Sequence, residues 1–267
     1  MKTSLSLTGA ILVVYATLFS GHALAGKPEQ IVKCVRANVP LTASSRSITL
    51  TRQTQTETTE MSGRLYMLRE LQEDNSALLR AVLALEAPPS LSGAAYLVRE
   101  NRNDANESMF VYLPGVGRVR RIAGGFADGP MMGTDFSYFE FKQLIDTFSD
   151  LTPSVGPVHT VSGRAAQVLD FTPRPGTETV YSRIRTWIDH NTCLPLKAEF
   201  MRGDRVVKRM VVPPTSITKY GKRWYMNEVR MTDIAKGSTT ILSVDEVTFN
   251  EPLSSSRFNP GSFYRTK

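Results

Sequence analysis

The stretch "MFVYLPGVGRVRRIAGGFADGPMMGTDFSYFEF" (Met109–Phe141) decides the fold, because it contains the change from strand-like to helix-like sequence. Its first part alternates apolar and polar residues around a turn at Pro114–Gly117, which predicts two antiparallel strands. Near its end, Ser137 and Glu140 have the spacing of a capping box, in which each side chain satisfies a free backbone amide at a helix start. The stretch therefore predicts a hairpin, a loop and then one helix.

The predicted helix has a single apolar side. Large apolar residues recur at helical spacing and form a stripe along one face. The members of this stripe are Tyr138, Phe141, Leu144, Ile145 and Phe148. A helix of this kind is expected to bury that face, either as a plug of the sheet or as a cover over an apolar hollow.

Upstream of this stretch the sequence mostly has a period of two. Residues 47–71 are rich in threonine and have a polar centre at Glu57–Glu60, which predicts a long hairpin. Residues 77–88 are continuously apolar and fit either a helix or a buried strand; their position between hairpins favours a strand. Residues 27–40 predict a short amphipathic helix, and residues 101–106 predict a turn.

Downstream of the helix the sequence returns to strands and continues so to Phe249. In residues 179–189, Ile184 and Ile188 are expected on one face of a strand. The next strand is expected to set together Leu194, Leu196, Ala198 and Phe200. Adjacent strands at this spacing, with few helices, predict a mainly β fold: one curved antiparallel sheet in a single domain, residues 26–267.

The first 25 residues have the three-part layout of a secretory signal. Lys2 precedes an apolar run from Leu7 to Phe19, and the small residues Ala23 and Ala25 follow it. The run is short of the about 20 apolar residues that a membrane span takes, so a secretory signal is favoured over a membrane anchor. Because residue 26 is Gly rather than Cys, an acylated product is not expected. The sequence predicts a soluble exported protein.

Two cysteines, Cys34 and Cys193, remain after the predicted signal. Two thiols in an oxidising compartment tend to pair. A bridge over this separation would remove roughly 5 kcal/mol of unfolded-chain entropy in the loop-closure model. The alternative is two unpaired buried thiols. Neither cysteine belongs to a CxxC motif, so redox catalysis and zinc binding are not expected.

The net charge of +7 is spread along the chain rather than gathered in a tail. Such a charge either serves solubility or meets anionic membrane surfaces or acidic partners, and it gives no reason to expect nucleic-acid binding.

No residue pattern indicates an enzyme, a metal or a cofactor. After the predicted signal the only histidines are His159 and His190, and neither has an HxH or HExxH neighbour. The chain contains no GxSxG nucleophile motif. The glycines at Gly115 and Gly117 are followed by a strand-like segment rather than a helix, so a hairpin turn is favoured over a dinucleotide loop.

Three segments carry a resemblance to a known family: "YLPGVGRVRRIAGG" (112–125), "MMGTDFSYFEF" (131–141) and "RTWIDHNTCLPLKAEF" (185–200). In this order they resemble the outer-membrane lipoprotein-sorting protein family, which is related to the LolA and LolB lipoprotein carriers. The resemblance covers residues 33–263. It implies an unclosed, half-barrel antiparallel sheet, strongly curved and covered by helices on its apolar concave face.

The resemblance also implies a function and a place in the cell. It points to a monomeric periplasmic carrier that binds lipoprotein acyl chains, or another lipidic cargo, in an apolar cavity for transfer towards the outer membrane. An RND-type inner-membrane exporter is the partner that it suggests. The alternative is a non-enzymatic periplasmic adaptor subunit of an RND-type envelope exporter, which would carry no lipid.

The candidate cargo site consists of the glycine-rich loop and the helix, which would act as a lid. Glycines give the loop backbone freedom, and its two methionines adapt to irregular acyl chains. The predicted ligand-binding residues are Tyr112, Phe126, Met131, Met132, Phe136, Tyr138, Phe141, Leu144 and Ile145. The alternative is that the helix is a permanent plug and the loop is plain surface.

Three arginines before the loop, Arg118, Arg120 and Arg121, are candidates to pin the lid or to meet a head group. Strand alternation places Arg118 and Arg120 on one face and Arg121 on the other. The alternative is that these arginines lie on the solvated convex face of the sheet.

Overall fold

The computed structural model describes residues 27–72, 77–100, 108–146, 148, 151–250 and 252–265. The predicted secretory signal (residues 1–25) and the predicted turn at residues 101–106 lie outside these ranges and stay predictions. No helix among the described residues combines the length and the apolarity that a membrane crossing requires.

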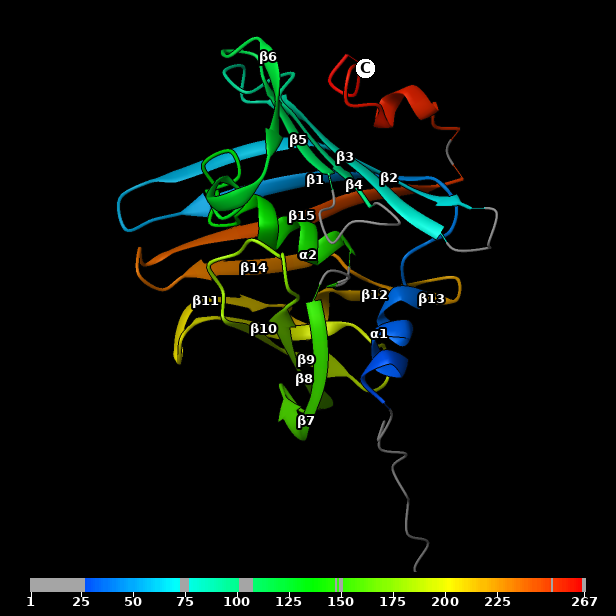
Figure 1. Cartoon of the computed structure of the whole chain (residues 1–267), viewed down its shortest axis with the longest axis vertical. Coiled ribbons are helices and arrows are strands. Elements are labelled where there is room, and N and C mark those ends of the chain that lie inside the picture. Colours follow the sequence, from blue (N-terminus) through cyan, green and yellow to red (C-terminus); the bar gives the residue numbers. More distant parts are fainter. Residues whose placement is uncertain are drawn as a thin grey trace, which may run out of the picture.

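The fold is mainly β, and one antiparallel sheet of thirteen strands dominates it (Figure 1). Its first half contains β1 (Ser44–Gln53), β2 (Thr58–Leu71), β3 (Ala77–Ala87), β4 (Ala95–Arg99), β5 (Ser108–Leu113) and β6 (Arg118–Ile122). Its second half contains β7 (Leu151–Val161), β8 (Arg164–Pro173), β9 (Arg183–Asp189), β10 (Pro195–Arg202), β11 (Arg205–Val211), β14 (Glu228–Asp233) and β15 (Ser238–Phe249). The hairpin of β12 (Ile217–Tyr220) and β13 (Arg223–Met226) stands apart and follows the short helix η2 (Pro214–Ser216).

The strand order is β6-β5-β4-β3-β2-β1-β15-β14-β11-β10-β9-β8-β7. The first and last strands of the chain, β1 and β15, pair in the middle of the sheet and join its two halves. Strands β6 and β7 are the two ends of this order, so the sheet does not close. Because β6 and β7 follow each other in sequence, the connection between them passes from one edge of the sheet to the other. This connection, which we call the strap, contains η1 (Gly124–Phe126) and helix α2 (Tyr138–Asp146).

Contacts of the strap show that the sheet is strongly curved. The hydroxyl of Tyr96 on β4 donates a hydrogen bond to the carbonyl oxygen of Tyr138 (3.0 Å). Just beyond α2, the ring of Phe148 stacks on Phe171 of β8, with the ring centroids 4.7 Å apart. Strands β4 and β8 are nine steps apart in the strand order, about 43 Å in a flat sheet. A nine-residue helix is about 14 Å long, so the sheet must bend around α2.

Helix α2 begins where the capping box predicts. The backbone N–H of Ser137 donates to Glu140 Oε2 (2.7 Å), and the N–H of Glu140 donates to Ser137 Oγ (3.1 Å). The helix ends at Asp146. Phe148, which the apolar stripe places on the same helix, instead has a left-handed backbone with φ +62°. Its ring is still buried against the sheet.

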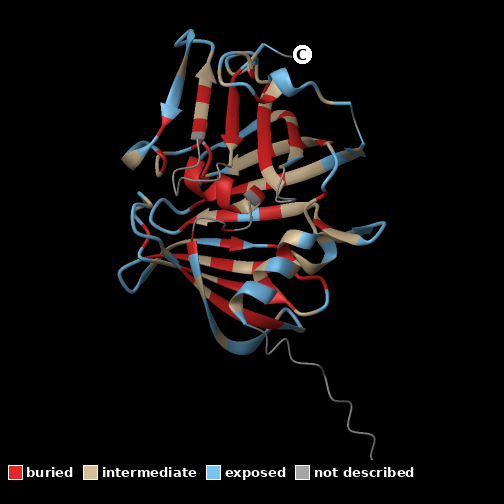
Figure 2. Ribbon diagram, turned by 45° about the vertical axis from the view of Figure 1, so that its right-hand side comes forward, coloured by how far each residue is buried: buried red, intermediate tan, exposed pale blue. Residues whose placement is uncertain are grey.

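Both faces of β3 and β4 are covered, because consecutive residues of these strands are buried; Figure 2 colours the buried residues of the sheet red. Alternation along β4 places Tyr96 and Val98 in the main core with α2. The side chains between them, Ala95 and Leu97, face outward, where the C-terminal segment with η3 (Ser255–Phe258) packs on them. Residues 77–87 form a strand, as their position between hairpins predicts.

The N-terminal helix α1 (Pro28–Ala37) packs on the sheet through Ile31 and Val35. The predicted disulfide is confirmed: Cys34 is bonded to Cys193, with the two Cα atoms 5.7 Å apart. The bond fixes α1 to the turn between β9 and β10.

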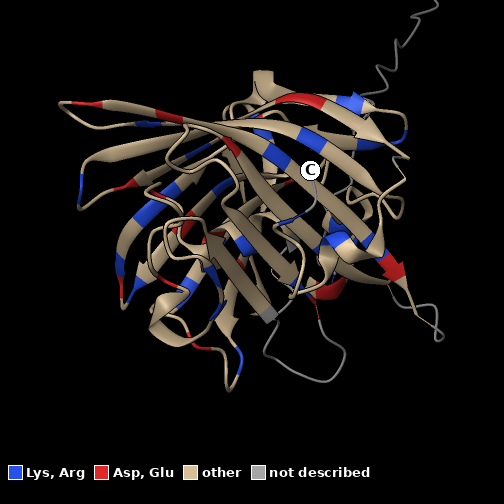
Figure 3. Cartoon of the chain, turned by 90° about the horizontal axis from the view of Figure 1, so that it is seen from above, with Lys and Arg blue, Asp and Glu red and all other residues tan. Residues whose placement is uncertain are grey.

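The two open edges of the sheet carry residues that discourage pairing with another chain. Arg118, Arg120 and Arg121 are exposed on edge strand β6. The other edge strand, β7, contains Pro153 and Pro157, which cannot donate a backbone hydrogen bond. Lysine and arginine residues are spread over many strands and loops rather than gathered in one segment (Figure 3).

Candidate functional site

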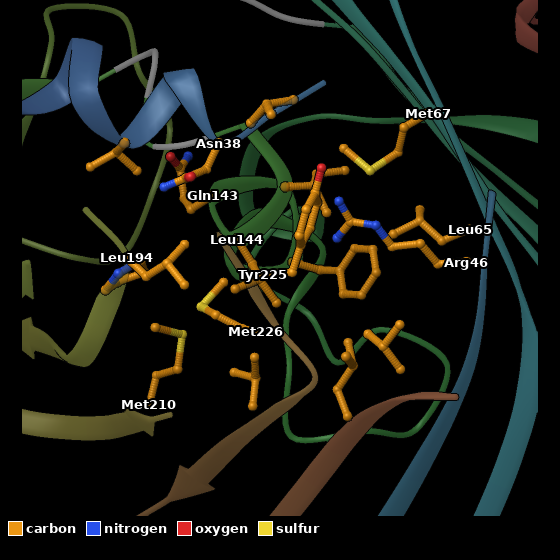
Figure 4. Close-up of a pocket in the computed structure, with 18 of the residues that line it drawn as sticks. Asn38, Arg46, Leu65, Met67, Gln143, Leu144, Leu194, Met210, Tyr225 and Met226 are labelled. Carbon is orange, nitrogen blue, oxygen red and sulfur yellow. The ribbon is translucent and has the colours of Figure 1, made fainter. Parts of the chain in front are cut away.

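An apolar cavity of about 80 Å³ lies between α2, the sheet and the β12–β13 hairpin. Helix α2 contributes Phe141, Leu144 and Ile145 to its wall. The strands of both halves of the sheet contribute Ile48, Leu65, Met67, Met210, Val229, Leu242 and Val244. Three of the lining residues, Met67, Met210 and Met226, are methionines (Figure 4), whose unbranched side chains adapt to differently shaped apolar guests.

Asn38, at the end of α1, organises one side of the cavity. Its Nδ2 donates to the carbonyl oxygen of Thr192 (2.7 Å), beside the disulfide. Its Oδ1 accepts a hydrogen bond from the backbone N–H of Trp224 (2.9 Å) on β13. One side chain thus ties α1, the disulfide turn and the β12–β13 hairpin together at the cavity wall.

Arg46 on β1 is the charged residue that lines this apolar cavity. In Figure 4 its guanidinium lies beside Tyr225, and Cζ is 5.3 Å from the centre of the tyrosine ring. Its Nε is buried and has no hydrogen-bond partner in the part of the chain that the structure describes. Burial lowers the pKa of Arg46, because a charged group loses hydration there.

A second, more open groove of about 790 Å³ adjoins the cavity. The two share Val39 and Phe148 as lining residues, so the cavity and the groove meet at this point. Five cationic residues line the groove: Lys33, Arg36, Arg69, Arg174 and Arg223. Glu29 is the single acidic residue of the described lining.

The part of the strap before α2 is anchored by the buried carboxylate of Asp135. It accepts hydrogen bonds from the hydroxyl groups of Ser238 (2.5 Å) and Thr240 (2.8 Å) on β15. The guanidinium of Arg52 on β1 lies 3.4 Å from the same carboxylate. The backbone N–H of Asp135 also donates to Thr240 Oγ1 (2.9 Å).

Glu140, in the first turn of α2, forms a second buried anchor. Its carboxylate accepts a hydrogen bond from Lys208 Nζ on β11 (2.9 Å) and another from the hydroxyl of Tyr181. Burial, together with the neighbouring carboxylate of Glu140, raises the pKa of Tyr181, so the hydroxyl keeps the proton that it donates. The start of α2 is therefore held to the second half of the sheet.

Three of the predicted ligand-binding residues, Phe141, Leu144 and Ile145, line the cavity. Three others are buried in the main core without lining it: Met131, Phe136 and Tyr138. Their role there is to pack the strap onto the sheet.

The other predicted ligand-binding residues lie away from the cavity. Phe126 in η1 is 46% exposed. Met132 is partly buried and packs against the main core. Tyr112 points to the outer face of the sheet, where its ring stacks on Tyr264, with centroids 3.9 Å apart. The exposed arginines of β6 do not line the cavity either.

Arg46 is a site residue that the sequence reasoning missed. Its signal is visible in "SRSITL", where Arg46 is in phase with the buried Ile48 and Leu50. A charged residue at a core position of a strand is an exception to binary patterning and points to a special role.

The described residues contain no group of three or more His, Cys, Asp or Glu side chains that could hold a metal ion. The polar side chains that line the cavity, such as Asn38 and Arg46, are few, and apolar residues surround them. This arrangement is suited to binding an apolar guest.

A comparison with known protein families identifies the family of this chain. A family model for an uncharacterized protein matches residues 79–265. The match covers more than half of the chain, so the chain belongs to this uncharacterized family. No curated protein matches the sequence.

Solved structures show the same fold. A DUF1329 family protein from Desulfovibrio piger has a TM-score of 0.77 and 23% identity, over 88% of this chain and 98% of the other. An outer membrane lipoprotein-sorting protein domain from Vibrio parahaemolyticus has a TM-score of 0.75 and 21% identity, over 88% and 97%. The LolA superfamily protein NE2245 from Nitrosomonas europaea has a TM-score of 0.67 and 14% identity, over 88% and 98%.

Proposed function

We propose that this protein is an exported periplasmic carrier that binds an acyl chain, of a lipoprotein or of another lipid, for transfer towards the outer membrane. The observation that carries the proposal is the apolar cavity between α2 and the curved sheet, with Phe141, Leu144 and Ile145 on its helical side. The disulfide between Cys34 and Cys193 suits an oxidising compartment. The structures of lipoprotein-sorting relatives with the same fold support the choice of cargo.

The size of the cavity implies that the strap moves when cargo enters. Small-molecule sites are commonly about 300–1,000 Å³, whereas this cavity has about 80 Å³. An acyl chain of ordinary length therefore needs more room than the cavity beneath α2 has in this conformation. Each methylene group of an entering chain gains about 0.8 kcal/mol when it leaves water, and this gain is what would displace α2.

We infer that the end of α2, rather than its start, moves to admit cargo. The start is fixed by the buried carboxylates of Asp135 and Glu140. Leu144 and Ile145, in the last turns of α2, are apolar residues that line the cavity and pack in the main core. Phe148 follows at the border with the basic groove. Apolar contacts are not directional and can be exchanged for contacts with an acyl chain.

The substitution Leu144→Glu tests the cavity as the binding site. Leu144 is only partly buried, so a glutamate can be accommodated without unfolding the helix. A carboxylate at this wall is expected to weaken acyl-chain binding about 100-fold, because burying it beside an apolar chain costs several kcal/mol. Titration of the delipidated protein with the fluorescent fatty acid cis-parinaric acid measures the affinity.

Phe126→Glu is the matched control, since Phe126 belongs to the same strap but is exposed and does not line the cavity. Its affinity for the probe is expected to equal that of the unmodified protein. Equal loss in both variants would place the site in the glycine-rich loop instead. Absence of saturable binding by the unmodified protein would contradict the carrier proposal and favour an exporter adaptor that carries no lipid.

A further inference from the structure

Arg46 is an unusual residue for the wall of an apolar cavity. Its Nε is buried without a hydrogen-bond partner, and no ion pair with Arg46 is formed among the described residues. Among the described residues, the ring of Tyr225 is the aromatic partner of its guanidinium. Arg46 is partly exposed at the cavity wall, and its contact with the Tyr225 ring leaves the buried Nε donor without an acceptor. A buried donor that is left unpaired costs free energy in the folded protein.

Arg223, at the start of β13, extends this feature towards the basic groove. Its Nε is also buried without a hydrogen-bond partner. Arg46 and Arg223 both lie close enough to Tyr225 to oppose the rise in its pKa that burial causes. Two arginines with unused donors therefore flank one tyrosine. Tyr225 lines the cavity and Arg223 lines the groove, so the pair stands where the two meet.

The basic groove supplies a second, independent observation. Apart from Arg223, four more cations face it, against the single carboxylate of Glu29 in its described lining. Its walls also include apolar residues such as Val32 and Leu151. A groove that combines cations with apolar walls and opens beside an apolar cavity is complementary to an anionic amphiphile, in both charge and polarity.

We propose that Arg46 and Arg223 bind the acidic head group of the lipid cargo, a phosphate or a carboxylate, while its acyl chain occupies the cavity. This inference rests on the proposed carrier function and names the class of its cargo as an anionic amphiphile. The planar guanidinium groups donate paired hydrogen bonds that match phosphate and carboxylate oxygens. Binding the head group supplies acceptors for the Nε donors of both arginines, which have none among the described residues.

The test compares lipids that share a palmitoyl chain and differ in the head. Lysophosphatidic acid carries a phosphate, palmitate a carboxylate, and 1-monopalmitoylglycerol no charge. Each displaces a neutral fluorescent acyl probe from the delipidated full chain. At least one anion is expected to bind about tenfold or more tightly than the neutral lipid. The tighter of the two anions identifies the head group as phosphate or carboxylate.

The double substitution Arg46→Met and Arg223→Met is expected to reduce anion affinity to the level of monopalmitoylglycerol, whose own affinity stays unchanged. Arg120→Met, on the exposed edge strand β6, is the matched control and should alter neither. Equal affinity of the unmodified protein for all three heads would overturn the proposal and leave the carrier function standing. Equal loss of neutral and anionic lipids in the double variant would also overturn it.

Thermal unfolding separates recognition from a structural role. Because Arg46 Nε has no acceptor among the described residues, Arg46→Met is expected to leave the unfolding temperature of the delipidated protein unchanged or to raise it. A marked fall would show that the arginine stabilises the fold and would count against head-group recognition. If no palmitoyl lipid of any kind binds the unmodified protein, the carrier function itself fails, and the head-group assignment fails with it.

Discussion

Replacement of Asp135 by alanine is expected to lower the free energy of unfolding by about 3–5 kcal/mol, the usual effect of removing one partner from a buried charged pair. The carboxylate is buried and accepts hydrogen bonds from Ser238 and Thr240, with Arg52 beside it. Alanine would leave these donors without an acceptor in the interior. For a chain of this size the loss corresponds to about 10 °C in unfolding temperature, which calorimetry or circular dichroism would measure.

Asp245→Ala is the control for this prediction, because Asp245 lies on the same strand, β15, but is exposed. Its effect should stay within about 0.5 kcal/mol. Similar unfolding temperatures for the two variants would show that Asp135 does not anchor the strap. The prediction matters for function, since the proposed opening of α2 needs its start to stay fixed while its end moves.

Removal of the disulfide by the double substitution Cys34→Ala and Cys193→Ala is expected to cost about 2–5 kcal/mol of stability. The cysteines are separated by 159 residues in sequence, so the bond closes a long loop in the unfolded chain, and the upper end of this range is expected. The bond also holds α1 in place. Asn38 at the end of α1 forms the hydrogen bonds that fix one wall of the cavity. Denaturant unfolding measures the change.

Treatment of the unmodified protein with a reductant provides an independent control for the disulfide. Reduced protein and the double variant should unfold at the same denaturant concentration, below that of the oxidised protein. If the oxidised protein and the double variant unfold together, the bond contributes nothing to stability, and α1 is held by the packing of Ile31 and Val35 and by the hydrogen bonds of Asn38.

Local patterns allowed much of the fold to be predicted. The start of α2 followed from two residues, Ser137 and Glu140, because a capping box is a contact between neighbours in sequence. The hairpin of β1 and β2 followed from alternation around a polar centre. The pairing of β1 with β15 could not be derived in this way, because it joins segments nearly two hundred residues apart and leaves no local signal.

Which face of a strand is interior was harder to predict, because both faces of the first half of the sheet are apolar. Tyr112 was assigned to the cavity, yet the C-terminal segment covers its face, and Tyr112 packs on Tyr264. Likewise Leu196 was grouped with Ala198 and Phe200, but a bulge between Pro195 and Lys197 turns it to the opposite face, beside Trp187.

The candidate site was predicted in part. The apolar stripe of α2 identified Phe141, Leu144 and Ile145 from helical periodicity alone. Arg46 was missed, because its significance depends on the lack of a partner in the folded protein. Its phase with Ile48 was the only clue in the sequence. A property that consists of an unsatisfied group emerges only from the packed structure.

Native mass spectrometry of the protein purified without detergent from the periplasm of a producing bacterium tests the central claim most directly. A carrier with an apolar cavity beneath α2 is predicted to retain a lipid, seen as a discrete added mass that organic extraction removes. The Leu144→Glu variant should lack this mass, and the Phe126→Glu variant should keep it. Protein that carries no lipid, and that acquires none after incubation with phospholipid vesicles, would contradict the account.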